Sequence, residues 1–228
     1  KTSGVDIRTI GLFAAVGIPY SIKFLWAPLT DAFEVPLLSR MLGRRRAWLI
    51  LSQLLLIAAV IFLAFCDPAA APGLVALGAL LVATASATQD IVVDAFRVES
   101  LPEDEQAAGM ASYVAAYRVG MLVSGAGALV LVGRLQAAGY TIPAAWTWTY
   151  LAMAALVLIG MATTLVAREP TVSMKAETAH VHERRDNPLG RAVKTALNAF
   201  VDFLSRDMAL VILAFVALFK LADALSSS

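Results

Sequence analysis

Charged residues are scarce in this sequence, and so are cysteine and histidine. Only 15% of the 228 residues are charged, compared with about 25% in a typical soluble domain, while 60% are hydrophobic. A single cysteine, Cys66, excludes a disulfide framework and a cysteine-rich metal site. Both histidines, His180 and His182, lie in a polar stretch, so a histidine-built active site in the apolar part is excluded too. This composition excludes a disordered chain and an ordinary cytosolic enzyme, and it predicts an integral membrane protein.

A strong net charge and catalytic motifs are also missing. The formal net charge is +1, which provides no global field to attract a polyanion, so we expect no nucleic-acid partner. The sequence shows no nucleophile–base arrangement, no glycine-rich phosphate loop and no set of side chains at metal-ligand spacing. We therefore predict that the protein is not an enzyme and that it uses no metal or cofactor.

Long apolar runs make up most of the chain. A helix needs about 20 mostly apolar residues to cross the hydrocarbon core of a bilayer. Six segments meet or approach this length: residues 9–30, 47–66, 68–89, 107–133, 146–167 and 208–225. The segments 47–66, 68–89 and 146–167 contain no charge, whereas the others are interrupted by Lys23, by Arg118, and by Lys220 with Asp223. The sequence therefore predicts an all-α, polytopic membrane protein with six visible spans.

Basic residues indicate the orientation of these spans. They gather in the loop after the first segment, at Arg40, Arg44, Arg45 and Arg46, and again in the connection 168–207. The turn at Asp67 has no basic residue, and the loop 134–145 has only Arg134. Since Lys and Arg accumulate on the cytoplasmic side, we predict that the first two connections are cytoplasmic and the other two external. The first segment then enters from outside, so we expect a further helix upstream and more chain downstream.

The connection 168–207 is the only extensive polar region. Residues 169–187 are charged and lack apolar periodicity, which is typical of a flexible linker. Apolar residues then recur at helical spacing between Leu189 and Leu204. This pattern fits either a helix lying in the membrane interface or a solvated helix packed on the protein.

The end of the third segment carries a short polar motif, SATQDIVVDAFRVES. Asp90, Asp94 and Arg97 follow one another at spacings of four and three residues and therefore share one helix face. A charge within a span costs at least about 2.5–3.5 kcal/mol and usually faces a cavity or a partner. We interpret Asp94 and Arg97 as a pair that locks helices together near the cytoplasmic rim. For Asp90, a proton-binding or pathway role and a structural role are both open.

Polar residues in three other segments are further candidates. Arg118 lies between apolar turns, with Tyr113 and Tyr117 beside it, and it stays protonated. It is suited to binding an anionic substrate or to holding a carboxylate such as Asp90. Tyr20 and Lys23 share a face of the first segment, and we expect them to reach an internal cavity, although Lys23 is also able to extend to an interface. Lys220 and Asp223 are spaced for a local pair.

The loop WAPLTDAFEVPLLSRMLGRRRAW resembles the loop between helices two and three of the major facilitator superfamily. Asp31, Gly43, Arg44 and Arg45 match its motif in kind, with a longer spacer between Asp31 and Gly43. GLFAAVGIPYSIKFLWAPLTD, LGRRRAWL, SATQDIVVDAFRVE and YRVGMLVSGAGAL together resemble the AmpG-type muropeptide permeases, a branch shared with acetyl-CoA transporters. LFKLADAL fits helix seven of the same family.

The resemblance implies a fragment of a major facilitator superfamily transporter, covering helices two to seven of an expected twelve. Residues 1–167 would form most of the N-terminal lobe, without its first helix. Residues 168–207 would form the cytoplasmic linker between the lobes, with its amphipathic helix. Residues 208–228 would form the first helix of the C-terminal lobe.

Permeases of this branch carry anhydro-muropeptides into the cytoplasm for cell-wall recycling, driven by the proton gradient. The resemblance therefore implies a multi-pass symporter of the bacterial inner membrane, whose partners are a muropeptide, protons and the lipid bilayer. Our own hypothesis adds a substrate cavity formed by Tyr20, Lys23, Tyr113, Tyr117 and Arg118, and a cytoplasmic latch at Asp31. The alternatives are transport of another solute, such as acetyl-CoA or a siderophore, and a membrane sensor or scaffold that transports nothing.

Overall fold

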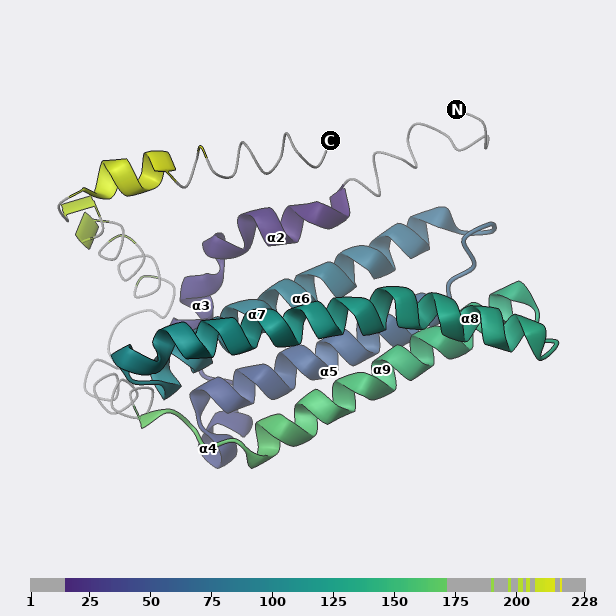
Figure 1. Cartoon of the computed structure of the whole chain (residues 1–228), viewed down its shortest axis with the longest axis horizontal. Coiled ribbons are helices and arrows are strands. Elements are labelled where there is room, and N and C mark those ends of the chain that lie inside the picture. Colours follow the sequence, from purple (N-terminus) through teal and green to yellow (C-terminus); the bar gives the residue numbers. More distant parts are fainter. Residues whose placement is uncertain are drawn as a thin grey trace.

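The computed structural model describes residues 15–171, 190, 197, 201–202, 204–205, 208–215 and 218. Among these residues the regular secondary structure is helical, and none of them lies in a strand. Figure 1 shows the long helices running side by side along the longest axis of the molecule. The predicted all-α fold class is confirmed.

Four helical runs within residues 15–171 are long and apolar enough to cross a membrane. They are α5 (Arg44–Ala64), α6 (Pro72–Ser100), the run Glu103–Ala137, and α9 (Ile142–Val166). The third run joins η3 (Glu103–Glu105), α7 (Gln106–Leu122), the π-helical η4 (Val123–Gly127) and α8 (Ala128–Ala137). Each run coincides with one predicted segment: 47–66, 68–89, 107–133 and 146–167.

Helix α6 extends beyond the apolar run that predicts it. The run stops at Gln89, but the helix continues to Ser100, so Asp90 lies about three turns before the helix end. A charged residue ends an apolar run by composition, but it does not end a helix. Asp94 and Arg97 lie in the last two turns of α6, whereas Asp90 lies deeper in the helix.

The first predicted segment is broken within its described part. It consists of η1 (Ala15–Gly17), α2 (Ile18–Ile22), η2 (Lys23–Leu25) and α3 (Ala27–Ala32). Pro19 and Pro28 stand in the first turns of α2 and α3, where a missing N–H does no harm. Trp26 lies between η2 and α3 and separates the two. The described part of the predicted segment 9–30 therefore consists of short helical pieces, and residues 9–14 lie outside the described residues.

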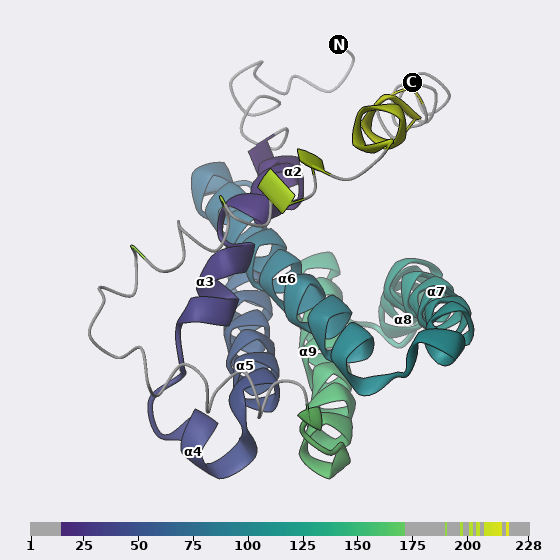
Figure 2. The ribbon, with the colours of Figure 1, turned by 90° about the vertical axis from the view of Figure 1, so that its left-hand side faces the viewer.

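Helix α5 lies at the centre of the bundle, packed against α6 and α9, while α8 packs against α9 and α2 against α6. Figure 2 shows this arrangement end-on, with the α7–α8 run standing outside the α5–α6–α9 group. Small residues such as Ala47, Ala59 and Ala87 are buried at these contacts, because they let helix backbones approach closely. Larger apolar side chains point outward, as expected for helices surrounded by lipid.

A short helix occupies the long loop between the first segment and α5. Helix α4 (Leu38–Leu42) fills the spacer between Asp31 and Gly43, which explains why that spacer exceeds the common form. Most of the connection 168–207 lies outside the described residues, and so does half of the predicted span 208–225, including Lys220 and Asp223. The division into two lobes and a linker remains a prediction.

Candidate functional site

A polar cavity lies between the first segment, α6 and α7. It measures about 470 Å³ and is lined by Tyr20, Ser86, Gln89, Asp90, Val93, Tyr113 and Tyr117. Its α6 residues are spaced three or four apart, and so are its two α7 tyrosines, which places each set on one face of its helix. Three separate segments therefore contribute to one site.

Asp90 is the centre of this cavity's polar contacts. Lys23 Nζ forms an ion pair with one carboxylate oxygen of Asp90. The Tyr113 hydroxyl donates a hydrogen bond to the other oxygen at 2.7 Å. The Lys23 and Asp90 side chains are only 31% and 25% exposed, so water screens their attraction less than it would at an open surface. Both oxygens of Asp90 are thus held by groups from other segments.

Two further hydrogen bonds fasten the broken first segment to α6. The Tyr20 hydroxyl donates to Ser86 Oγ at 2.7 Å, one helical turn before Asp90. Trp26 Nε1 donates to Thr88 Oγ1 at 3.2 Å. Because η2 interrupts the helical path after α2, these contacts and the Lys23 ion pair fix where Lys23 meets α6. Lys23 is therefore paired with an acid inside the bundle.

The α7 side of the cavity is aromatic. The rings of Tyr113 and Tyr117 stack with their centroids 6.5 Å apart and an angle of 24° between their planes. Arg118, the next residue, is exposed and forms no ion pair within the described part of the chain. Of the two roles predicted for Arg118, holding Asp90 is not the one observed, because Asp90 pairs with Lys23 instead.

Asp94 and Arg97 lie farther along α6 and join it to the start of α7. Arg97 pairs with Asp94 at 3.7 Å and donates to Gln106 Oε1 at 3.4 Å. Gln106 Nε2 in turn donates to the backbone oxygens of Val98 and Leu101. These contacts stabilise the α6–α7 turn, and no group of three metal-binding side chains occurs among the described residues.

A second charged cluster lies where α5 begins. The Arg45 side chain, 5% exposed, donates to Asp31 at 2.6 Å and makes two bonds to Glu99, at 3.0 and 2.5 Å. Arg44 donates to the backbone oxygen of Asp31 at 2.9 Å. Three of the four predicted loop-motif residues, Asp31, Arg44 and Arg45, are thereby joined to each other and to the end of α6.

Glu169 and Arg46 hold α5 and α9 together. Glu169, which follows α9, caps the start of α5, and Arg46, in the first turn of α5, caps the end of α9. The Glu169 carboxylate accepts hydrogen bonds from the backbone N–H groups of Arg45 and Arg46, at 2.8 and 3.1 Å. A carboxylate at this position also complements the positive end of the α5 dipole. The Arg46 guanidinium donates to the backbone oxygens of Thr164 and Leu165 in the last turn of α9, at 3.0 and 2.6 Å.

Gly43 is required at the start of α5 for two reasons, so Gly43→Ala should destabilise the protein by about 1–3 kcal/mol. Its φ of +88° is rarely adopted by residues with a side chain, and an added Cβ would lie 2.5 Å from Glu169 Cδ. The matched control is Gly73→Ala in the first turn of α6, where no atom lies within 4 Å. Thermal unfolding of the purified full-length protein in detergent checks this. A lowered midpoint for Gly43→Ala alone is expected, and equal midpoints would contradict it.

Sequence reasoning missed Glu99, Gln106 and Glu169. Glu99 and Gln106 flank the α6–α7 turn, and they were missed because the apolar run that predicts α6 stops at Gln89. Glu169 follows the last apolar residues of α9, where an acid beside a basic loop is suited to capping a helix. The helix that Glu169 caps is α5, whose N–H groups lie 123 and 124 residues earlier in the chain, so no local sequence pattern indicates the contact.

The model of the Major Facilitator Superfamily matches residues 2–227 of this chain. The anhydromuropeptide permease of Escherichia coli (strain K12) is 37% identical over 225 residues, which cover 98% of this chain and 41% of that protein. The putative transporter AmpG 4 of Rickettsia conorii is 33% identical over 225 residues, covering 99% of this chain and 51% of the relative. The chain thus spans about half the length of the curated relatives it matches.

Proposed function

The chain belongs to the major facilitator superfamily, and on that basis we propose that it is part of a permease importing anhydro-muropeptides across the bacterial inner membrane, coupled to protons. Family membership and the apolar helices make it a multi-pass membrane protein of a transporter family. The name of the Escherichia coli relative supports the muropeptide as substrate. The observation that carries the coupling is the ion pair between Lys23 and Asp90, the acid that lines the cavity.

The cavity offers the groups that an acidic sugar derivative requires. Gln89 lines the cavity and provides an amide for hydroxyl groups. Lys23, which pairs with Asp90 of the lining, is the nearest described cation for a substrate carboxylate. The stacked Tyr113 and Tyr117 present aromatic surface beside them, which suits the apolar face of a sugar ring. Anhydro-muropeptides combine a disaccharide with carboxylates, so this set of side chains fits that class of solute.

Proton coupling follows from the two states available to Asp90. While Asp90 is ionised, Lys23 is occupied and has little attraction for an anionic substrate. Protonation removes the negative charge, after which Lys23 is free to pair with a substrate carboxylate. Proton binding to Asp90 and substrate binding to Lys23 then favour each other. The proton removes the carboxylate that competes with the substrate for Lys23, and the substrate removes the ammonium group that competes with the proton for Asp90. Movement of the lobes around the site, once it holds proton and substrate, would release the proton and the substrate on the cytoplasmic side.

The cytoplasmic cluster around Arg45 is the proposed latch for this movement. Asp31 is 48% exposed on the first segment, whereas Arg45 and Glu99 belong to α5 and α6. Breaking the Asp31–Arg45 contact therefore removes one tie between the first segment and α5 without separating α5 from α6. An ion pair with one exposed partner is worth only about 0.2–1 kcal/mol, which suits a contact that opens in every cycle.

Asp31→Ala should therefore slow transport by about twofold to fivefold while leaving substrate affinity nearly unchanged. The matched control is Glu34→Ala, which removes an exposed acid from the same loop. Initial uptake rates and equilibrium binding of labelled muropeptide by the full-length protein separate the two effects. Equal rates for Asp31→Ala and the wild type would argue against a latch.

The proposed function itself is tested with the complete gene in a bacterium that lacks its own muropeptide permease. Uptake of labelled anhydro-muropeptide is measured with and without a protonophore. Accumulation that collapses with the protonophore supports both the substrate and its energy source. Absence of uptake by protein verified in the membrane overturns the substrate assignment, and binding of a solute without accumulation would indicate a sensor.

A further inference from the structure

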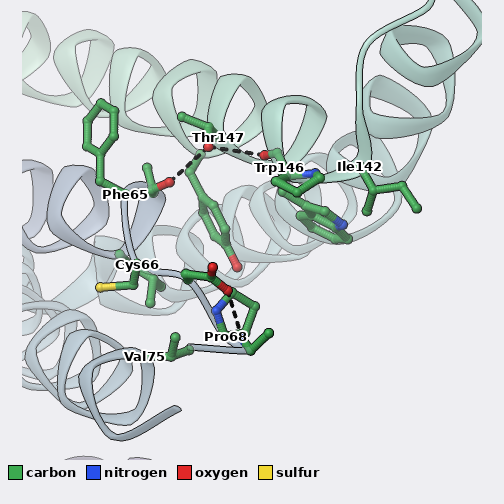
Figure 3. Close-up of a pocket in the computed structure, with 13 residues that line it drawn as sticks. Phe65, Cys66, Pro68, Val75, Ile142, Trp146 and Thr147 are labelled. Carbon is green, nitrogen blue, oxygen red and sulfur yellow. Dashed lines mark hydrogen bonds between the residues drawn. The ribbon is translucent and has the colours of Figure 1, made fainter. Parts of the chain in front are cut away.

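A second cavity lies at the opposite end of α5 from the Arg45 cluster. It measures about 600 Å³ and is formed where α5 ends, α6 begins and α9 begins. Its lining residues are Leu63, Ala64, Phe65, Cys66, Asp67, Pro68, Ala69, Val75, Ile142, Pro143, Trp146, Thr147 and Tyr150. Figure 3 shows these side chains around the space between the α5–α6 loop and the first turns of α9.

The walls of this cavity are held in place by hydrogen bonds. Thr147 Oγ1 lies 3.0 Å from the backbone oxygen of Ala64 and 3.1 Å from that of Pro143 (Figure 3). Asp67 Oδ1 accepts hydrogen bonds from the backbone N–H groups of Ala69 and Ala70, at 2.8 and 3.3 Å. The ends of α5 and α9 and the loop between α5 and α6 therefore keep a defined geometry around the space.

Asp67 is the only charged residue among those that line the cavity. Its second carboxylate oxygen has no hydrogen-bond partner within the described residues. Trp146 and Tyr150 line the same space, with ring centroids 6.0 Å apart and an angle of 35° between their planes. A carboxylate beside aromatic faces attracts an organic ammonium group, through charge and through the ring electrons.

The position of the cavity indicates which ammonium compound would reach it. The cavity lies at the ends of membrane-spanning helices, and Phe65 and Ile142 at its edge are 71% and 63% exposed. Aromatic residues such as Trp146 are typical of the level of the lipid headgroups. A ligand at this level with an ammonium head and apolar tails would pair with Asp67 and extend its tails along Phe65 and Ile142.

We propose that this cavity binds the headgroup of a phospholipid carrying a primary ammonium, of the phosphatidylethanolamine class. The ammonium group donates to the free oxygen of Asp67 and lies against Trp146. The site is separate from the Asp90 cavity and does not depend on which solute is transported. A lipid bound there would join α9 to the α5–α6 loop.

Asp67→Asn is the decisive variant, because an asparagine oxygen can still accept the hydrogen bonds from Ala69 and Ala70. The variant therefore removes the charge and keeps the turn. Asp104→Asn, an exposed acid before α7, is the matched control. The full-length protein is placed in detergent with equal amounts of phosphatidylethanolamine and phosphatidylglycerol, and retained lipids are measured by native mass spectrometry.

We expect the wild type and Asp104→Asn to retain the ethanolamine lipid about fivefold to tenfold more than the glycerol lipid. Asp67→Asn should lose this preference. Brominated phosphatidylethanolamine should quench the fluorescence of Trp146, and loss of this quenching in Trp146→Phe locates the lipid. Slower maleimide labelling of Cys66 in the presence of the lipid gives a second readout. Equal retention by wild type and Asp67→Asn overturns the proposal, and so does displacement of the lipid by a water-soluble muropeptide.

Discussion

Replacing Asp90 by asparagine should abolish proton-driven accumulation of substrate while leaving the protein in the membrane. A side-chain amide at this position cannot bind the proton, and Lys23 would lose its ion-pair partner in a cavity where both side chains are at most 31% exposed. Removal of one partner from such a pair destabilises the fold by about 1–3 kcal/mol, and loss of the proton-binding carboxylate is what should abolish the gradient-driven accumulation. Uptake is measured with an imposed proton gradient, and solute exchange without a gradient is measured in the same vesicles.

Three further variants distinguish coupling from simple support of the fold. Asp94→Asn, one helical turn along α6, removes a carboxylate whose partner is Arg97, so proton-driven uptake should persist. Lys23→Met should weaken substrate binding. The double variant Lys23→Met with Asp90→Asn removes both charges and should recover stability without recovering transport. Normal proton-driven uptake by Asp90→Asn would remove Asp90 from the mechanism.

Arg45→Met should produce the largest loss of stability in the described part of the chain. The Arg45 side chain is 5% exposed and neutralises Asp31 and Glu99 together, and the Glu99 side chain is itself only 15% exposed. Its removal leaves two carboxylates close together, one of them nearly buried, at a cost of about 3–5 kcal/mol. The thermal midpoint of the full-length protein in detergent and its yield as a monodisperse species report this loss.

Arg40→Met is the control for that measurement, since Arg40 is an exposed arginine in the preceding helix α4. Adding Glu99→Gln to Arg45→Met should recover part of the stability, because it removes the nearly buried carboxylate that Arg45 no longer neutralises. Arg45→Lys should be intermediate, since lysine cannot make the two parallel bonds to Glu99. An unchanged midpoint for Arg45→Met would show that the cluster does not stabilise the fold.

Hydrophobic run length predicted the long helices because lipid replaces water around them. A span such as 47–66 or 146–167 has no alternative to a helix in the bilayer, so composition alone fixes its structure. The same reasoning placed the end of the third span too early, at Gln89. The helix continues through Asp90 to Ser100, and the partner of that charge, Lys23, is known only from the tertiary structure.

The candidate site was predicted as a set of residues but not as a set of contacts. Tyr20, Lys23, Asp90, Tyr113 and Tyr117 could be selected because polar groups in apolar spans need partners. Which partner each one meets depends on the rotation and the axial position of neighbouring helices. The sequence offered Arg118 as a partner for Asp90, whereas the structure pairs Asp90 with Lys23.

The mutual capping by Glu169 and Arg46 limits where this molecule can change shape. A slide of α9 along α5 by one helical turn, about 5.4 Å, would break all four hydrogen bonds between Glu169, Arg46 and their backbone partners at once. The two helices should therefore move as one rigid body. Any rearrangement that opens the Asp90 cavity must then occur where the first segment and α7 contact α6. Side-chain hydrogen bonds such as Tyr20–Ser86, Trp26–Thr88 and Tyr113–Asp90 hold these elements to α6.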